Sequence, residues 1–387
     1  MVYRNERSEL KSLVRMLCMG AWYSALIGIL SSCSLVLPVQ RDTRQLFPEL
    51  HPISNSIVFI IHGDGEYLYH DTAGNEYKAD EEALTGAIRV AEQNPGAEVF
   101  IFHQKERRNF LFLFPQCDGE WYRYRNGSLI AEGSYWRGKG ALRFEPEVDL
   151  YRQFGANNEV SGASVFLYFG HEIPESPGRN YDMSYPDQSF TVDDLAAGLL
   201  GFTNTSRKFD LLVLSTCYGG TPYTISTLGP YAKTIVASPE NLHLSYFDLR
   251  TLEWLEISTE EGALSAFADR FAREAFDRLR ERTLTTVTVA VYDVNRVQDF
   301  LQSVQRTPDV WPVAGTQNEP AIKTEQTHFD CSDDPSCTTP STSNGVKVYF
   351  RPALFGLSRN TQSHSGWGRR IKSELPGSPS KSAVTVH

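Results

Sequence analysis

The sequence predicts an α/β fold with a mostly parallel central sheet, flanked by helices and carrying an inserted β-hairpin region. Short apolar runs alternate with amphipathic helical segments along residues 55–307, as is typical of strands joined by helical crossovers. An aromatic segment over residues 107–145 interrupts this alternation. We therefore expect one α/β domain over residues 55–307 that contains the hairpin insert.

The domain begins with the pattern of a βαβ unit. Residues 57–61 are an apolar run followed by a glycine-containing turn, as expected for a buried strand. Residues 79–94 carry apolar side chains at helical spacing, and Pro95 and Gly96 end that pattern. Residues 97–104 form the next apolar run. A helix between two strands indicates parallel pairing.

The insert, residues 107–145, has a strand pattern of its own. Aromatic and polar side chains alternate, and Asp118-Gly119 and Asn126-Gly127 are typical hairpin turn pairs. This alternation favours a sheet with one packed face and one solvated face over a nucleic-acid-binding surface.

The rest of the domain continues the alternation. Apolar runs within 163–171, 209–217, 233–242 and 284–294 predict strands, and residues 225–232 cover a return between two of them. Helices are expected over 189–202, with Thr191 as the N-cap, over 260–282, and over 295–305. Residues 308–387 form a polar C-terminal region that we expect to be largely disordered, with 346–355 as a late strand.

The N-terminus has the features of an export signal. Four basic residues precede an uncharged apolar stretch, residues 17–30, and the stretch leads into Leu30-Ser-Ser-Cys33. This resembles a bacterial lipobox, which implies lipidation of Cys33, removal of residues 1–32 as a signal peptide, and a tether over 33–54. The expected location is the bacterial cell envelope, with the chain bound to the membrane through its lipid. An uncleaved anchor helix or a misassigned start codon are the alternatives.

Charge and cysteine content narrow the function further. The formal net charge is −10, with no dominant basic stripe, so we expect no nucleic-acid partner. Among the 6 cysteines, Cys331 and Cys337 lie close together in a polar segment and are predicted to form a local disulfide after export. We expect Cys117 to be structural. Cys217 is left over and calls for a chemical explanation.

Two residues with catalytic potential follow consecutive predicted sheet strands. His171 comes after VFLYFG and Cys217 after LLVLST. Because sites in open α/β sheets form at the carboxyl ends of the strands, these two side chains are expected to converge. Histidine and cysteine together suffice for thiol catalysis, and Gly219 and Gly220 would let a substrate backbone approach. The alternative is a buried cysteine that only packs.

The segment KFDLLVLSTCYGGTPYTISTLGPYAKTIVASPENL resembles the nucleophile region of the clostripain family of cysteine peptidases, within the caspase–gingipain superfamily. The matching residues are Phe209, Asp210, Cys217, Gly220, Tyr231, Ala232, Val236, Ala237, Ser238 and Glu240. The first strand, followed by Gly63-Asp64, and the hairpin insert also resemble that family. The resemblance extends over about residues 55 to 300.

The resemblance implies a caspase-like sandwich and a cysteine endopeptidase without a cofactor, acting on a peptide or protein substrate. Cys217 would be the nucleophile and His171 the general acid and base. The backbone N–H groups of Glu172 and Cys217 would bind the oxyanion.

Two departures from the family pattern bear on activity and specificity. Glu172 stands where the family has glycine after the histidine, and Ser215 replaces the aspartate that lines the pocket for an arginine or lysine side chain. Ser215, Gly219 and Gly220 remain the expected substrate-binding residues. The competing function is a catalytically degenerate lipoprotein of the same fold that binds or scaffolds.

Other patterns are less specific. Asp64, Glu66, His70 and Asp71 form a polar cluster after the first strand, for which a solvated loop is the commoner interpretation and a divalent-cation site the alternative. We expect no bound metal. The chain has no Gly-x-Ser-x-Gly motif, which argues against an α/β-hydrolase.

Overall fold

The computed structural model describes most of the chain between residues 53 and 355. The described residues are 53–64, 68–70, 73–110, 114–138, 143–155, 162–177, 182, 184–186, 189–203, 207–242, 247–257, 260, 262–297 and 345–355. The signal peptide, Cys33, the pair Cys331 and Cys337, and most of the expected helix 295–305 lie outside them. Within the described ranges, every helix is too short or too polar to cross a bilayer.

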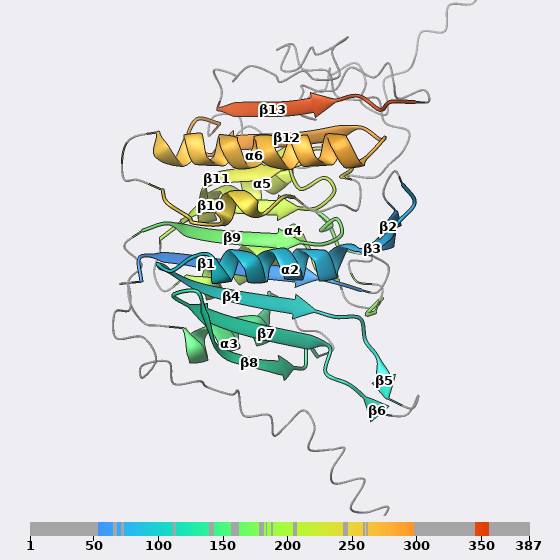
Figure 1. Ribbon diagram of the computed structural model, residues 1–387, viewed down its shortest axis with the longest axis vertical. Coiled ribbons are helices and arrows are strands. Elements are labelled where there is room, and N and C mark those ends of the chain that lie inside the picture. The colour runs from blue at the N-terminus through green and yellow to red at the C-terminus, as the bar shows by residue number, and fades with distance from the viewer. Residues whose placement is uncertain are drawn as a thin grey trace, which may run out of the picture.

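A nine-stranded sheet organises the described part of the chain (Figure 1). Its strands are β1 (Asn55–His62), β4 (Ala97–Gln104), β7 (Gly119–Arg125), β8 (Ser128–Tyr135), β9 (Ser164–Phe169), β10 (Phe209–Ser215), β11 (Ala232–Ala237), β12 (Val287–Asp293) and β13 (Val346–Arg351). Their order is β13-β12-β11-β10-β9-β1-β4-β7-β8. The five central strands, from β11 to β4, are parallel, and two antiparallel strands extend each edge.

Helices cover both faces of this sheet, which confirms the predicted mostly parallel α/β architecture (Figure 1). One face carries α2 (Ala79–Glu92) and α6 (Ala263–Arg282), and the other carries α3 (Glu145–Phe154), α4 (Val192–Leu199) and α5 (Pro222–Leu228). Short 3-10 turns are η2 (Leu200–Phe202), η3 (Gly229–Tyr231) and η4 (Arg250–Leu252). Two-stranded ladders join β2 (Leu68–His70) to β3 (Glu76–Lys78) and β5 (Asn109–Phe110) to β6 (Phe114–Pro115).

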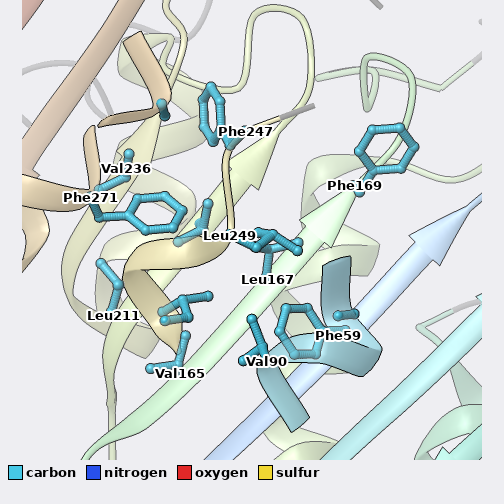
Figure 2. Close-up of a cluster of buried hydrophobic side chains, with 14 of the residues drawn as sticks. Phe59, Val90, Val165, Leu167, Phe169, Leu211, Val236, Phe247, Leu249 and Phe271 are labelled. Carbon is cyan, nitrogen blue, oxygen red and sulfur yellow. The ribbon is translucent and has the colours of Figure 1, made fainter. Parts of the chain in front are cut away.

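The core consists of two apolar layers separated by the sheet. Alternate residues of each central strand point to opposite faces, so Phe59 packs in the layer beneath α2 and α6 while Val58 packs beneath α3, α4 and α5. Figure 2 shows part of the first layer, in which strand side chains meet Phe271 of α6 and Phe247 and Leu249 from the segment after β11. The central strands are therefore apolar throughout, as expected for parallel strands covered on both faces.

Local signals explain several element boundaries. Thr191 starts α4 with a capping box, in which its hydroxyl accepts from the Asp194 N–H and the Asp194 side chain accepts from the Thr191 N–H. The expected late strand is present as β13, paired with β12. Helix α3 was not predicted, although its first turn contains Pro146 and two glutamates, which favour a helix start. The alternating aromatic pattern of the predicted hairpins runs up to residue 145, so it gives no indication that a helix begins there.

Candidate active site

His171 and Cys217 lie at the carboxyl ends of adjacent parallel strands. β9 pairs with β10 in a register that places Phe169 opposite Ser215. His171 and Cys217 each stand two positions beyond these paired residues. The Gly170 N–H donates to the Ser215 carbonyl at 3.3 Å and holds the two strand ends together. The expected juxtaposition of the two strand ends is thus part of the fold.

A buried carboxylate orients His171. The Nε2 atom of His171 lies 3.3 Å from the Asp64 Oδ2 atom, and the Asp64 side chain has no exposed surface, whereas that of His171 is 35% exposed. Asp64 follows β1, the neighbour of β9 on the side away from Cys217. The ring therefore directs Nε2 toward Asp64, and Nδ1 lies on the opposite side of the ring.

The solvated-loop interpretation is wrong for Asp64. Its side chain is buried, and it faces the histidine that the sequence marks as catalytic. The same interpretation holds for His70, whose ring is 60% exposed and lies 3.6 Å from the Glu76 carboxylate. The family-like Gly63-Asp64 pair was the available signal, but only the fold shows that the loop after β1 reaches His171.

The Cys217 thiol is reduced and partly buried. Its single S–H hydrogen has two acceptors within reach, the Asn241 side-chain oxygen at 3.0 Å and the Leu242 carbonyl at 3.1 Å. Burial raises the pKa of the Cys217 thiol to about 11, and the charge of Glu172 acts in the same direction. In this state the hydrogen-bond partners of the thiol are oxygen acceptors, and the imidazole of His171 is not among them.

Ser215 is buried rather than open to solvent. Its hydroxyl accepts a hydrogen bond from the Phe247 N–H at 3.1 Å, and 4% of the residue is exposed. The position where the clostripain family carries an aspartate is therefore covered by the segment after β11. A role for Ser215 in substrate binding requires that this segment move.

Packing within the protein explains why residues 219 and 220 are glycines. A Cβ atom on Gly219 would lie 2.7 Å from the Thr216 hydroxyl, and one on Gly220 would lie 2.6 Å from the Tyr292 hydroxyl. Tyr218, between Cys217 and these glycines, has a φ of 52°. The turn after Cys217 is thus tightly packed, and contact of these glycines with a substrate stays a prediction.

A buried polar network lies behind Asp64. The His62 Nδ1 atom is 2.8 Å from the Gln104 side-chain oxygen, and Arg137 donates to the Asp182 carboxylate at 2.5 Å. His62 Nε2 is 3.9 Å from Asp182. Burial, with help from the Arg137 charge, lowers the pKa of His62 to about 4, so this imidazole is neutral near pH 7.

His62, Asp64 and Asp182 bring potential ligand atoms within 4.8 Å of one another. Three buried oxygen and nitrogen donors at such distances are compatible with a divalent cation. However, the guanidinium of Arg137 already balances the charge of Asp182. We therefore describe this group as a charge network and assign no metal to it.

Cys117 is in a disulfide bond, consistent with the structural role expected for it. Of the cysteines in the described ranges, Cys217 is the one with a free thiol. Cys217 is therefore the nucleophile candidate in that part of the chain.

Comparison with known proteins identifies the segment that carries these residues. Residues 171–329 match the model of the clostripain family. The predicted resemblance to that family is confirmed. The match starts at His171 and contains Cys217, whereas the first strand and Asp64 precede it. No curated protein matches the chain.

Three solved structures of C11 proteases are similar in fold. An inactive zymogen from Parabacteroides distasonis is 11% identical, with a TM-score of 0.46 and coverage of 72% of this chain and 77% of that one. A secreted cysteine protease from Bacteroides thetaiotaomicron in complex with an irreversible peptide inhibitor is 12% identical, with a TM-score of 0.45 and coverage of 67% and 70%. A second structure of a secreted C11 protease from that organism, called iotapain, is 10% identical, with a TM-score of 0.44 and coverage of 68% and 75%.

Proposed function

We propose that this protein is a cysteine endopeptidase in which Cys217 is the nucleophile, His171 the general acid and base, and Asp64 a positioning residue. The observation that carries the proposal is the buried Asp64 carboxylate 3.3 Å from His171 Nε2, at the strand end beside that of Cys217. The clostripain-family match over the segment with His171 and Cys217 supports the same chemistry.

The first half of the reaction forms an acyl-enzyme. His171 Nδ1 takes the thiol proton, and the Cys217 sulfur attacks the scissile carbonyl carbon, so a C–S bond forms and the carbonyl oxygen becomes an oxyanion. When this intermediate collapses, the C–N bond breaks and the leaving amine takes the proton from the imidazolium. Asp64 stabilises the positive imidazolium and fixes the ring orientation.

The second half of the reaction restores the enzyme. His171 removes a proton from water, and the resulting hydroxide attacks the thioester carbonyl. The C–S bond then breaks, the product leaves as a carboxylic acid, and the sulfur regains its proton. The backbone N–H groups of Glu172 and Cys217 are the proposed oxyanion donors in both halves.

The location proposed for this activity is the bacterial cell envelope. An acyl chain on Cys33 would hold the chain at the membrane without a spanning segment. Replacing Cys33 with alanine should leave an unprocessed precursor and abolish palmitate labelling. Processing and labelling equal to those of the wild type would contradict the lipid anchor.

A second candidate is a binding lipoprotein with a degenerate site. The feature that favours it is the burial of Cys217, which together with the charge of Glu172 raises the thiol pKa to about 11. A thiol with this pKa has little thiolate at neutral pH, and the thiolate is the attacking species. Such a protein would bind peptides but not hydrolyse them.

Peptide hydrolysis by purified variants separates the two functions. Wild type should cleave an unstructured protein substrate, and Cys217→Ala should be inactive. His171→Ala should lose about 10³-fold or more in kcat, because nucleophile and base act as a unit. Circular dichroism should show both variants folded. Binding of substrate by wild type without cleavage would instead support the degenerate lipoprotein.

A further inference from the structure

The segment after β11 lies against the nucleophile. We call residues 238–242 the strap. The Gly220 N–H donates to the Ser238 carbonyl at 2.8 Å, and the Tyr218 N–H donates to the Glu240 carbonyl at 3.0 Å. Pairs 220 with 238 and 218 with 240 advance in opposite directions along the chain, so the strap runs antiparallel to the nucleophile turn.

The last two residues of the strap contact the sulfur of Cys217. The side-chain oxygen of Asn241 and the carbonyl of Leu242 are the two acceptors within reach of the single S–H hydrogen of Cys217. Leu242 is 6% exposed and belongs to the apolar layer against which Cys217 packs. A carbonyl oxygen of the protein therefore lies 3.1 Å from the sulfur, which is the range of distance at which a substrate carbonyl carbon must approach it.

Residues that follow the strap in the chain also pack against the end of strand β10 and helix α6. The Phe247 N–H bonds to the Ser215 hydroxyl, and the Phe247 ring packs on Phe271 with centroids 6.3 Å apart. The next residue, Asp248, is buried and accepts hydrogen bonds from the Arg250 Nε atom at 2.9 Å and the Nη2 atom at 2.6 Å. The strap thus directly follows strand β11, and buried residues Phe247 and Asp248 come after it in the chain.

We propose that the strap is an internal competitor of the substrate, which keeps the peptidase in a resting state until an extended peptide displaces Asn241 and Leu242 from Cys217. This inference rests on the proposed function and adds its regulation. Displacement uncovers the sulfur and so ends the burial that raises the thiol pKa, and His171 can then take the proton. The strap and a substrate backbone cannot occupy the nucleophile turn together.

The test measures the reactivity of Cys217 in the full chain. Iodoacetamide alkylation at pH 7.5 is followed by mass spectrometry for wild type and Asn241→Ala. Burial is the main cause that raises the thiol pKa from 9.0 to about 11, so uncovering the sulfur can speed the reaction by at most about 100-fold. We expect alkylation to be several-fold faster in Asn241→Ala, because this substitution removes one contact of the strap with the sulfur. Asn75→Ala is the matched control, because Asn75 is exposed and remote from Cys217 in sequence, and its rate should equal that of the wild type.

A second variant keeps the test independent of how well Asn241→Ala folds. Asn241→Cys places a thiol beside Cys217, so mild oxidation should cross-link them, block alkylation, and be reversed by dithiothreitol. Asn75→Cys should not cross-link to Cys217. Wild-type alkylation rates in Asn241→Ala together with no cross-link in Asn241→Cys would overturn the strap.

Hydrolysis assays on the same proteins distinguish failure of the strap from failure of the peptidase. A faster-reacting thiol in Asn241→Ala without any peptide cleavage would support the strap and contradict the proposed peptidase activity. If wild type and Asn241→Ala cleave peptide at the same rate and are alkylated at the same rate, the peptidase activity is supported and the strap is contradicted.

Discussion

The buried imidazole of His62 should make the stability of the domain depend on pH. His62 has no exposed surface, and burial lowers its pKa from 6.5 to about 4 in the folded protein. The unfolded chain therefore binds more protons than the folded chain between pH 4 and pH 6.5. The free energy of unfolding is highest above pH 6.5 and decreases as the pH falls toward 4.

The size of this effect follows from the pKa difference. A difference of 6.5 − 4 = 2.5 pH units, at about 1.4 kcal/mol per unit, gives a total loss of about 3.5 kcal/mol in the free energy of unfolding, of which about 3 kcal/mol is lost by pH 4. The carboxyls of Asp210 and Asp248 have lowered pKa values, so their contribution is lost below their ordinary value of 3.8. The effects of these two carboxyls therefore fall below the range from pH 4 to pH 6.5 in which His62 acts.

Urea unfolding from pH 4 to pH 8 tests the assignment. His62→Asn keeps an N–H donor toward Gln104 but removes the titrating group. We expect the free energy of unfolding of the wild type to fall by about 3 kcal/mol more than that of His62→Asn between pH 6.5 and pH 4. Parallel pH profiles for the two proteins would refute the reasoning.

Three further substitutions test positioning, packing and capping. Asp64→Asn should reduce kcat by about 10²-fold or more with little change in KM, because it removes the charge that stabilises the His171 imidazolium; an unchanged kcat would argue against the positioning role. Gly220→Ala should lower the free energy of unfolding by about 1 to 3 kcal/mol, because the new Cβ atom would lie 2.6 Å from a buried tyrosine hydroxyl. In the control Gly96→Ala, the nearest atom is 3.4 Å from the new Cβ atom, so urea denaturation should show a smaller decrease. Thr191→Ala should lower the unfolding free energy by about 1 kcal/mol through loss of the capping box; equal urea midpoints would contradict this.

Local patterns in the sequence were sufficient to predict the elements that build the site. The central strands are long apolar runs because both faces are covered, and this pattern is visible without a structure. The positions of His171 and Cys217 after consecutive strands predicted that they share one edge of the sheet. The N-cap at Thr191 was also visible, because its partner Asp194 lies within one helical turn.

Interactions between distant segments could not be predicted in the same way. Asp64 and His171 are separated by more than one hundred residues, and their contact depends on β1 lying beside β9. The strap was read as the end of a strand, since nothing in Ala-Ser-Pro-Glu-Asn-Leu marks Asn241 and Leu242 as partners of Cys217. Local propensity carries no information about which strands pair or where a loop returns.

The environment of the Cys217 thiol could not be predicted from the sequence either. The pair of glycines after Cys217 suggested an open approach for a substrate backbone. In the structure they are required by contacts within the protein, and the strap lies along the same turn. A resting peptidase and a degenerate one therefore share these residues, and they differ in whether the strap can be displaced.

Covalent trapping of the nucleophile tests the central claim most directly. The full chain is incubated with a peptide that carries a thiol-reactive ketone, and the modified residue is located by peptide mapping. We predict a single adduct on Cys217 that is absent from Cys217→Ala and formed much more slowly in His171→Ala. Absence of an adduct on Cys217, or substrate cleavage by Cys217→Ala at the rate of the wild type, would contradict the account.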